Sequence, residues 1–172
     1  MTTPPNNMRV LGIDPGIAIV GWGLVESVGQ KLSCLGFGTI ETDKSLSTPE
    51  RLRGIFLNFG VLLESTRPDI IVIEELFFAK NRKTAMNVAQ ARGTLLAAAS
   101  VYGDVLEITP PQVKQFIAFS GRAQKARVGE MVKRILDLPS VPKPDDAADA
   151  VAIALCGTFI KTTGASARWR VK

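Results

Sequence analysis

An unbroken run of β-branched residues, Ile70 to Ile73, constrains the fold of this chain more than any other stretch. Arg67-Pro68-Asp69 interrupts the chain before the run, and Glu74 ends it. Such a run predicts a strand buried on both faces, as in parallel sheets covered by helices. Apolar residues at helical spacing precede it up to about Ser65, and a helix is expected after it from about Lys83 to Val101. Strands and helices that alternate in this way indicate an α/β fold.

The rest of the chain extends this strand into a sheet. Three antiparallel strands are expected first, joined by a turn at Gly29, over residues 9–13, 18–26 and 32–42. A short strand is expected over residues 105–108, and helices over residues 110–119, 123–136 and 144–160. We therefore predict an α/β domain in which helices flank a mixed sheet.

Length and composition favour one domain with a single core, since 46% of the 172 residues are hydrophobic. We expect a disordered N-terminal extension over residues 1–7, the folded domain over residues 8–161 and a basic, flexible tail over residues 162–172. Residues 1–7, MTTPPNN, lack the features of a signal peptide. No apolar stretch reaches the roughly 20 residues that a membrane span needs. The expected location is therefore cytoplasmic.

The residue types that the chain lacks limit the kinds of catalytic and metal-binding site that it can form. The chain has no histidine, which excludes imidazole acid–base catalysis and imidazole metal ligands. Its two cysteines, Cys34 and Cys156, stand far apart, which favours reduced, buried thiols over a zinc or redox pair. A catalytic site must then use carboxylates, lysine, hydroxyls or cysteine. The net charge of +5 is only suggestive of a polyanionic partner.

Four carboxylates stand at positions where a sheet and a helix can bring them together. Asp14 and Glu74 each end an apolar strand. If these strands are parallel neighbours, both side chains emerge at the carboxyl edge of the sheet, where open α/β sheets bind their ligands. Asp146 and Asp149 are three residues apart and so share one helix face. Because carboxylates at one edge repel one another, a hard divalent cation such as Mg²⁺ or Mn²⁺ is favoured there.

Each carboxylate also has an ordinary structural explanation. Asp14 can open the Asp-Pro-Gly turn, and Glu74 can be the exposed end of a strand. Asp145 and Asp146 can complement the dipole of a helix N-terminus. Asp149 fits this explanation less well, because it stands in the second turn among small apolar residues, where an aspartate needs a partner or a cation.

Five motifs, in order, carry a resemblance to a known family: LGIDPG, IVIEELFFAKN, ARG, QVKQ and DDAADAVAIA. Over about residues 8–160 they resemble the RuvC-type Holliday-junction resolvases, which are ribonuclease-H-like nucleases that act as homodimers. The resemblance implies a metal-dependent, structure-selective endonuclease that resolves Holliday junctions by symmetric paired nicks in DNA recombination and repair. It also implies four-way junction DNA and a branch-migration complex of the RuvA and RuvB type as partners.

The same resemblance assigns the catalytic and metal-binding roles to Asp14, Glu74, Asp146 and Asp149. Two Mg²⁺ ions per active site are implied, with Mn²⁺ as a substitute. Some family members carry a histidine at the third position, whereas this chain has the aspartate form at Asp146. The neighbouring Asp145 leaves open which of these two residues is the ligand.

Aromatic and basic residues follow Glu74 and gather again around two later helix starts. They include the DNA-binding candidates Phe77, Lys80, Arg82, Lys83, Lys114, Arg122 and Lys125. A helix N-terminus flanked by lysine or arginine is a favourable binding site for a phosphate group. An aromatic side chain can stack on a nucleic-acid base. The resemblance selects Phe77 as a wedge at the junction centre, and Lys114 and Lys125 as phosphate contacts. The structural alternatives are core packing for the aromatic residue and a solvated face for the charges.

Two other functions compete with this hypothesis. Actin-like and sugar-kinase ATPases share a strand and turn similar to GIDPG, but they need two such domains and this chain has length for one. A non-catalytic nucleic-acid-binding module would not need all four acids. For the dimer, Ala85, Ala89, Gly93 and Ala97 give the helix after residue 83 a stripe of small residues, which suits close helix contact or packing against the sheet.

Overall fold

The computed structural model describes residues 7–76 and 82–162 and contains a five-stranded sheet in the order β3-β2-β1-β4-β5. The strands are β1 (Asn7–Asp14), β2 (Ile19–Val28), β3 (Lys31–Glu41), β4 (Ile70–Glu74) and β5 (Asp104–Ile108). β1, β2 and β3 are antiparallel neighbours, whereas β4 lies parallel to both β1 and β5. The predicted mixed sheet, with the first strand beside the Ile70–Ile73 strand, is therefore confirmed.

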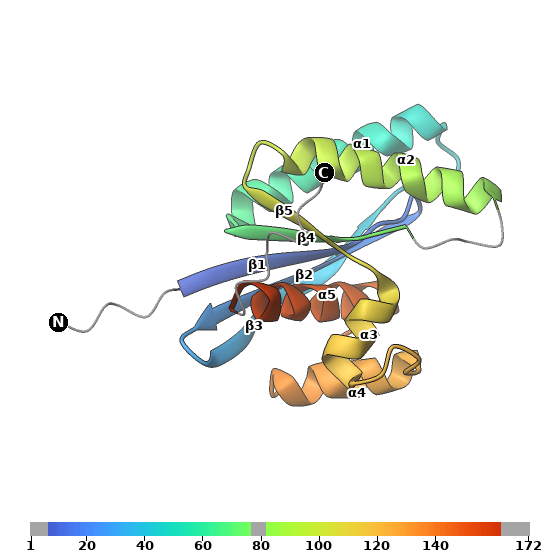
Figure 1. Ribbon diagram of the computed structural model, residues 1–172. Coiled ribbons are helices and arrows are strands. Elements are labelled where there is room, and N and C mark those ends of the chain that lie inside the picture. The colour runs from blue at the N-terminus through green and yellow to red at the C-terminus, as the bar shows by residue number, and fades with distance from the viewer. Residues whose placement is uncertain (1–6, 77–81, 163–172) are drawn as a thin grey trace.

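Helices cover both faces of this sheet (Figure 1). One face carries α1 (Thr48–Thr66) and α2 (Arg82–Ala99). The other carries α5 (Asp145–Thr162), with α3 (Pro110–Ala118) and α4 (Lys125–Ile135) packed beyond it. Several helix boundaries differ from the prediction by one or two residues, among them those of α3 and α4. α3 ends at Ala118, and α4 begins at Lys125 rather than at residue 123, because Gln124 is the extended N-cap residue.

The strand β4 contributes side chains to both apolar clusters of the core, one on each face of the sheet. Ile70 and Val72 join the cluster under α5, whereas Ile71 and Ile73 join the cluster under α1 and α2. This alternation follows from the two-residue period of a strand, and all four side chains are buried, as the sequence predicts.

The helix α5 is the most enclosed helix of the described fold. Residues 150–156 are fully buried, since each has 0% of its surface exposed. The helix contacts four of the five strands on one side and α3 and α4 on the other. A helix that is apolar on every side is expected in this position.

The two ends of the chain and its two cysteines can be compared with the sequence-based prediction. The expected N-terminal extension and basic tail lie outside the described residues, except Asn7 in β1 and Thr162 in α5. Cys34 and Cys156 form no disulfide, and Cys156 is buried. Of the helices described, none is both long and apolar enough to cross a membrane.

Candidate active site

Asp14 and Glu74 end two strands that lie side by side. In the parallel register of β1 and β4, Ile13 is opposite Ile73, so each carboxylate follows a paired residue at the same edge of the sheet. Strand alternation places Asp14 and Glu74 on the face that α5 covers, because Gly12 and Val72, two residues before each, contact α5 or its cluster. Both acidic side chains therefore point toward the helix that carries the other two acids.

Glycines bring α5 unusually close to the sheet at this point. Gly21 pairs with Asp14 across β1 and β2, and a Cβ atom at Gly21 would collide with the backbone carbonyl oxygen of Asp146. Gly12 is blocked in the same way by the backbone of Ala150. Only glycine permits a backbone approach this close. The first turn of α5 thus lies directly over the residue that neighbours Asp14.

The four carboxylates influence one another electrostatically. Burial raises the pKa of Asp14 to about 7, with further contributions from the charges of Asp149 and Asp146. Burial also raises the pKa of Glu74 to about 8, and the charges of Asp14 and Asp149 add to this effect. The pKa of Asp149 is raised mainly by burial. Asp14, Glu74 and Asp149, whose ionisation is opposed in this way, form a site that favours a cation.

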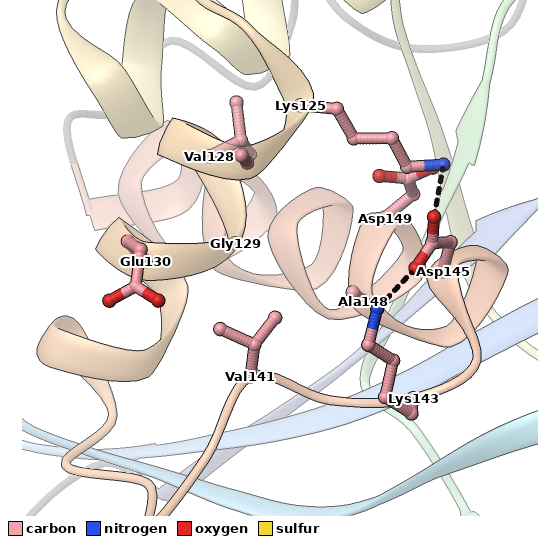
Figure 2. A pocket seen from close by; sticks show the side chains of 10 residues that line it. Lys125, Val128, Gly129, Glu130, Val141, Lys143, Asp145, Ala148 and Asp149 are labelled. Carbon is pink, nitrogen blue, oxygen red and sulfur yellow. Dashed lines mark hydrogen bonds and ion pairs between the residues drawn. The ribbon is translucent and has the colours of Figure 1, made fainter.

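A lysine provides positive charge within this group. The Nζ atom of Lys125, the first residue of α4, lies 2.7 Å from Oδ2 of Asp149 and 3.9 Å from Oδ2 of Asp145 (Figure 2). Burial acts to lower the pKa of Lys125, but the hydrogen bond and the charge of Asp149 outweigh it, so that the pKa is raised. Lys125 is therefore a cation at the start of α4 that pairs with an acid of α5.

The neighbouring acids Asp145 and Asp146 have different surroundings. Asp145 is exposed and accepts a hydrogen bond from Lys143 at 2.8 Å, which lowers its pKa (Figure 2). Asp146 is half-buried, and its charge acts on both Asp14 and Asp149. Of the two, Asp146 is the one whose charge reaches Asp14.

Lys125 contributes to the lining of two hollows. One, of about 240 Å³, is lined by Glu74, Pro110, Val113, Lys114, Lys125, Val128 and Asp149. We call it the catalytic groove. The other, of about 370 Å³, lies between α4 and the start of α5 (Figure 2). Lys114 and Lys125, predicted to bind phosphate, thus line the same groove as two of the acids.

The other predicted DNA-binding residues are not gathered in the groove. Arg122 is exposed in the turn between α3 and α4. Phe77 and Lys80 lie outside the described residues, and so do the side chains of Arg82 and Lys83.

The donor atoms of the site fit a hard divalent cation. Carboxylate oxygens are the preferred ligands of Mg²⁺ and Mn²⁺, and burial together with mutual repulsion raises the pKa values of Asp14 and Glu74, so a bound cation would stabilise their ionised forms. Within residues 7–76 and 82–162, however, no three acidic or sulfur side chains converge tightly enough to enclose an ion. Glu74 and Asp149 line one groove, and Lys125 pairs with Asp149 there.

Behind the site is an ion pair that sequence analysis did not single out. Arg92 of α2 pairs with Glu107 of β5, which stands beside Ile73 in the sheet. Both side chains are largely buried, and Glu75 contributes a further negative charge near the guanidinium. In the sequence this arginine appears only as part of the motif ARG. The fold shows that it pairs with β5, the strand next to the one that ends in Glu74.

A mixed sheet whose first strand and parallel neighbour both end in carboxylates, facing an acidic helix start, defines a ribonuclease-H-like nuclease. The sequence matches the family "Crossover junction endodeoxyribonuclease RuvC" over residues 10–157. This chain belongs to that family.

Individual relatives agree with this assignment. The crossover junction endodeoxyribonuclease RuvC of Alkaliphilus metalliredigens is 47% identical over 150 residues, covering 87% of this chain and 92% of the relative. The Brevibacillus brevis protein of the same name is 50% identical over 149 residues, covering 86% and 90%. Thermus thermophilus RuvC, solved in complex with a Holliday junction substrate, is 34% identical with a TM-score of 0.86, covering 95% of this chain and 100% of that one.

Proposed function

We propose that this protein is a Holliday-junction resolvase, an endonuclease that makes symmetric paired nicks in four-way junction DNA during recombination and repair. Its membership of the crossover junction endodeoxyribonuclease family supports this function. The observation that carries it is the meeting of Asp14, Glu74 and Asp149 beside Lys125 at one edge of the sheet. We assign this activity to one nuclease domain over residues 8–161.

The catalytic and metal-binding residues are Asp14, Glu74, Asp146 and Asp149. Together they would hold two Mg²⁺ ions, for which Mn²⁺ can substitute. When bound, such ions activate a water molecule and stabilise the leaving oxygen of the phosphodiester. Asp146 is assigned this role rather than Asp145, because Asp145 is exposed and is paired with Lys143.

The lysines of the groove position the phosphate. Lys114 and Lys125 line it from α3 and α4, and each charge acts to lower the pKa of Glu74. A phosphate that enters the groove meets two cations, which offset its repulsion from the acids. We assign further DNA contacts to Arg122, Lys80, Arg82 and Lys83, and the role of a wedge at the junction centre to Phe77.

The active form is a homodimer, since two paired nicks require two sites related by a two-fold axis. Ala89, Gly93 and Ala97 of α2 are exposed, and no atom lies within 4 Å of where a Cβ atom would stand at Gly93. The small residues of α2 are therefore open to a second copy instead of packing on the sheet. We also propose a cytoplasmic location and a branch-migration complex of the RuvA and RuvB type as partner.

Cleavage of a synthetic four-way junction, with and without Mg²⁺, tests this function. The wild-type protein should cut the junction symmetrically and only with the metal. Glu74→Gln keeps the shape of the side chain but removes its charge, so cleavage should fall by several orders of magnitude. Junction affinity should persist, because cations and aromatic contacts provide it. Rapid cutting by Glu74→Gln would place the metal site elsewhere, and joint loss of binding and cutting would make the carboxylates structural.

A further inference from the structure

The turn after α3 carries an aromatic residue in a conformation that favours glycine. Phe119 is the C-cap residue of α3, with a φ angle of 57° and a ψ angle of 20°. Its β-carbon makes this left-handed conformation unfavourable, and helix ends of this kind usually carry glycine. Its side chain is also 76% exposed, so no apolar burial offsets the strain. A strained residue without a packing role indicates a functional one.

Hydrogen bonds fix the turn that presents Phe119. The amide of Gly121 donates to Oε1 of Gln115 at 3.1 Å, and the amide of Ala123 donates to the carbonyl oxygen of Ser120 at 2.9 Å. Phe116, one turn earlier, packs against the core. The two phenylalanines of this segment thus face different environments, and Phe119 is held in the outward one.

Cationic residues flank Phe119 on both sides in the chain. Lys114 precedes it on α3 and Lys125 follows it on α4, and both line the catalytic groove. Arg122 and Arg127 are exposed nearby in the chain. The α3–α4 turn lies at the same end of the molecule as the start of α5 (Figure 1). Of the large exposed apolar residues described, Phe119 alone comes from residues 110–135.

A single aromatic ring among cations suits nucleic acid better than a protein partner. A protein interface needs a contiguous apolar patch, whereas a nucleic-acid strand needs positive charge and a ring on which a base can stack. We propose that Phe119 stacks on an unpaired base of the junction strand that enters the catalytic groove. This inference rests on the proposed function and adds to it an aromatic contact from the α3–α4 turn.

Phe119→Gly separates this contact from folding. Glycine relieves the backbone strain, so thermal stability should stay the same or rise. Junction affinity, measured by gel shift in EDTA, should weaken about tenfold, because one base loses its stacking partner. Affinity for a linear duplex of equal length should not change, since its bases are already stacked. Phe119→Tyr should behave as wild type, and Phe119→Asn, which also tolerates the left-handed conformation, should behave as Phe119→Gly.

Arg67→Gly is the matched control. Arg67 caps α1 with a φ angle of 43° before β4 begins, at the opposite edge of the sheet from Glu74. This change relieves the same kind of strain and should leave junction affinity unaltered. Unchanged junction affinity in Phe119→Gly, or an equal loss on linear duplex, would overturn the inference. Failure of the wild-type protein to bind the junction would instead contradict the proposed function, and the inference with it.

Discussion

The Nζ atom of Lys125 lies 2.7 Å from Oδ2 of Asp149, so a side chain of the protein neutralises one acid of the candidate metal site. The lysine is about half exposed, at 55%, and can therefore turn toward solvent or DNA without breaking the core. A metal ion bound by Asp149 would compete with the Lys125 ammonium for the same carboxylate. The lysine and the metal are thus alternative partners of Asp149.

Lys125→Met should strengthen metal binding while it slows cleavage. Removal of the competing ammonium leaves the acids with less positive charge, so Mg²⁺ should bind roughly tenfold more tightly by isothermal titration calorimetry. Cleavage of a four-way junction should slow, because the phosphate loses a cation in the groove. Weaker Mg²⁺ binding in this variant would show that Lys125 supports the metal site instead of competing with it.

The stability of the metal-free protein should fall as pH rises from about 4 to about 8. Folding raises the pKa of Asp14 from 3.8 to about 7 and that of Glu74 from 4.5 to about 8. Between these values the folded state binds more protons than the unfolded state, so the unfolding free energy decreases with pH. In EDTA, the Tm at pH 8.5 should lie several degrees below that at pH 5.

Magnesium should reverse this loss at high pH, because a cation stabilises the ionised acids. The double variant Asp14→Asn, Glu74→Gln provides the control, and its Tm should vary less with pH than that of the wild type. A wild-type profile in EDTA that is flat from pH 4 to pH 8 would contradict the raised pKa values.

Gly12→Ala should impair both folding and catalysis. The added methyl group would meet the backbone of Ala150 and Ala154, so α5 must shift away from the sheet. Overpacking of this kind typically costs about 1–3 kcal/mol. Urea unfolding should show the loss, and cleavage should fall because Asp146 and Asp149 move with the helix.

Gly54→Ala is the comparison for this variant. Gly54 stands in α1 with open space around the position of a Cβ atom. Alanine there should stabilise the protein by about 0.5–1 kcal/mol and leave cleavage unchanged. Equal effects of the two substitutions would show that the close approach of α5 has no special importance.

Asp145→Asn and Asp146→Asn should differ sharply in cleavage. Asp145 is exposed and pairs with Lys143 and Lys125, so its neutral variant should cut a junction at nearly the wild-type rate. Asp146→Asn should lose activity by orders of magnitude, because a neutral amide is a poor ligand for Mg²⁺. Cleavage rates under saturating Mg²⁺ provide the comparison, and the reverse order of activities would make Asp145 the ligand.

Local patterns were sufficient to predict much of the fold and the edge of the site. The run Ile70–Ile73 predicted a strand buried on both faces, and its parallel pairing with β1 brings Asp14 beside Glu74. The end of α3 was harder to locate, because apolar spacing continues through Phe119 although the backbone turns left-handed there.

Contacts between distant segments could not be predicted. The salt bridge of Lys125 with Asp149 joins two helices that are separated by a loop and a turn. The role of Gly21 depends on the position of Asp146, which lies more than a hundred residues further along the chain. Neither relationship leaves a periodic signal in the sequence, because each depends on how complete layers pack.

The enclosure of α5 determines how the site can fail. Amide groups in the fully buried segment from Ala150 to Cys156 should exchange with deuterium mainly through global opening of the domain, because they are shielded from water on every side. Asp146 and Asp149 belong to the same helix and share its cooperativity. We therefore expect heat inactivation of this protein to coincide with its global unfolding.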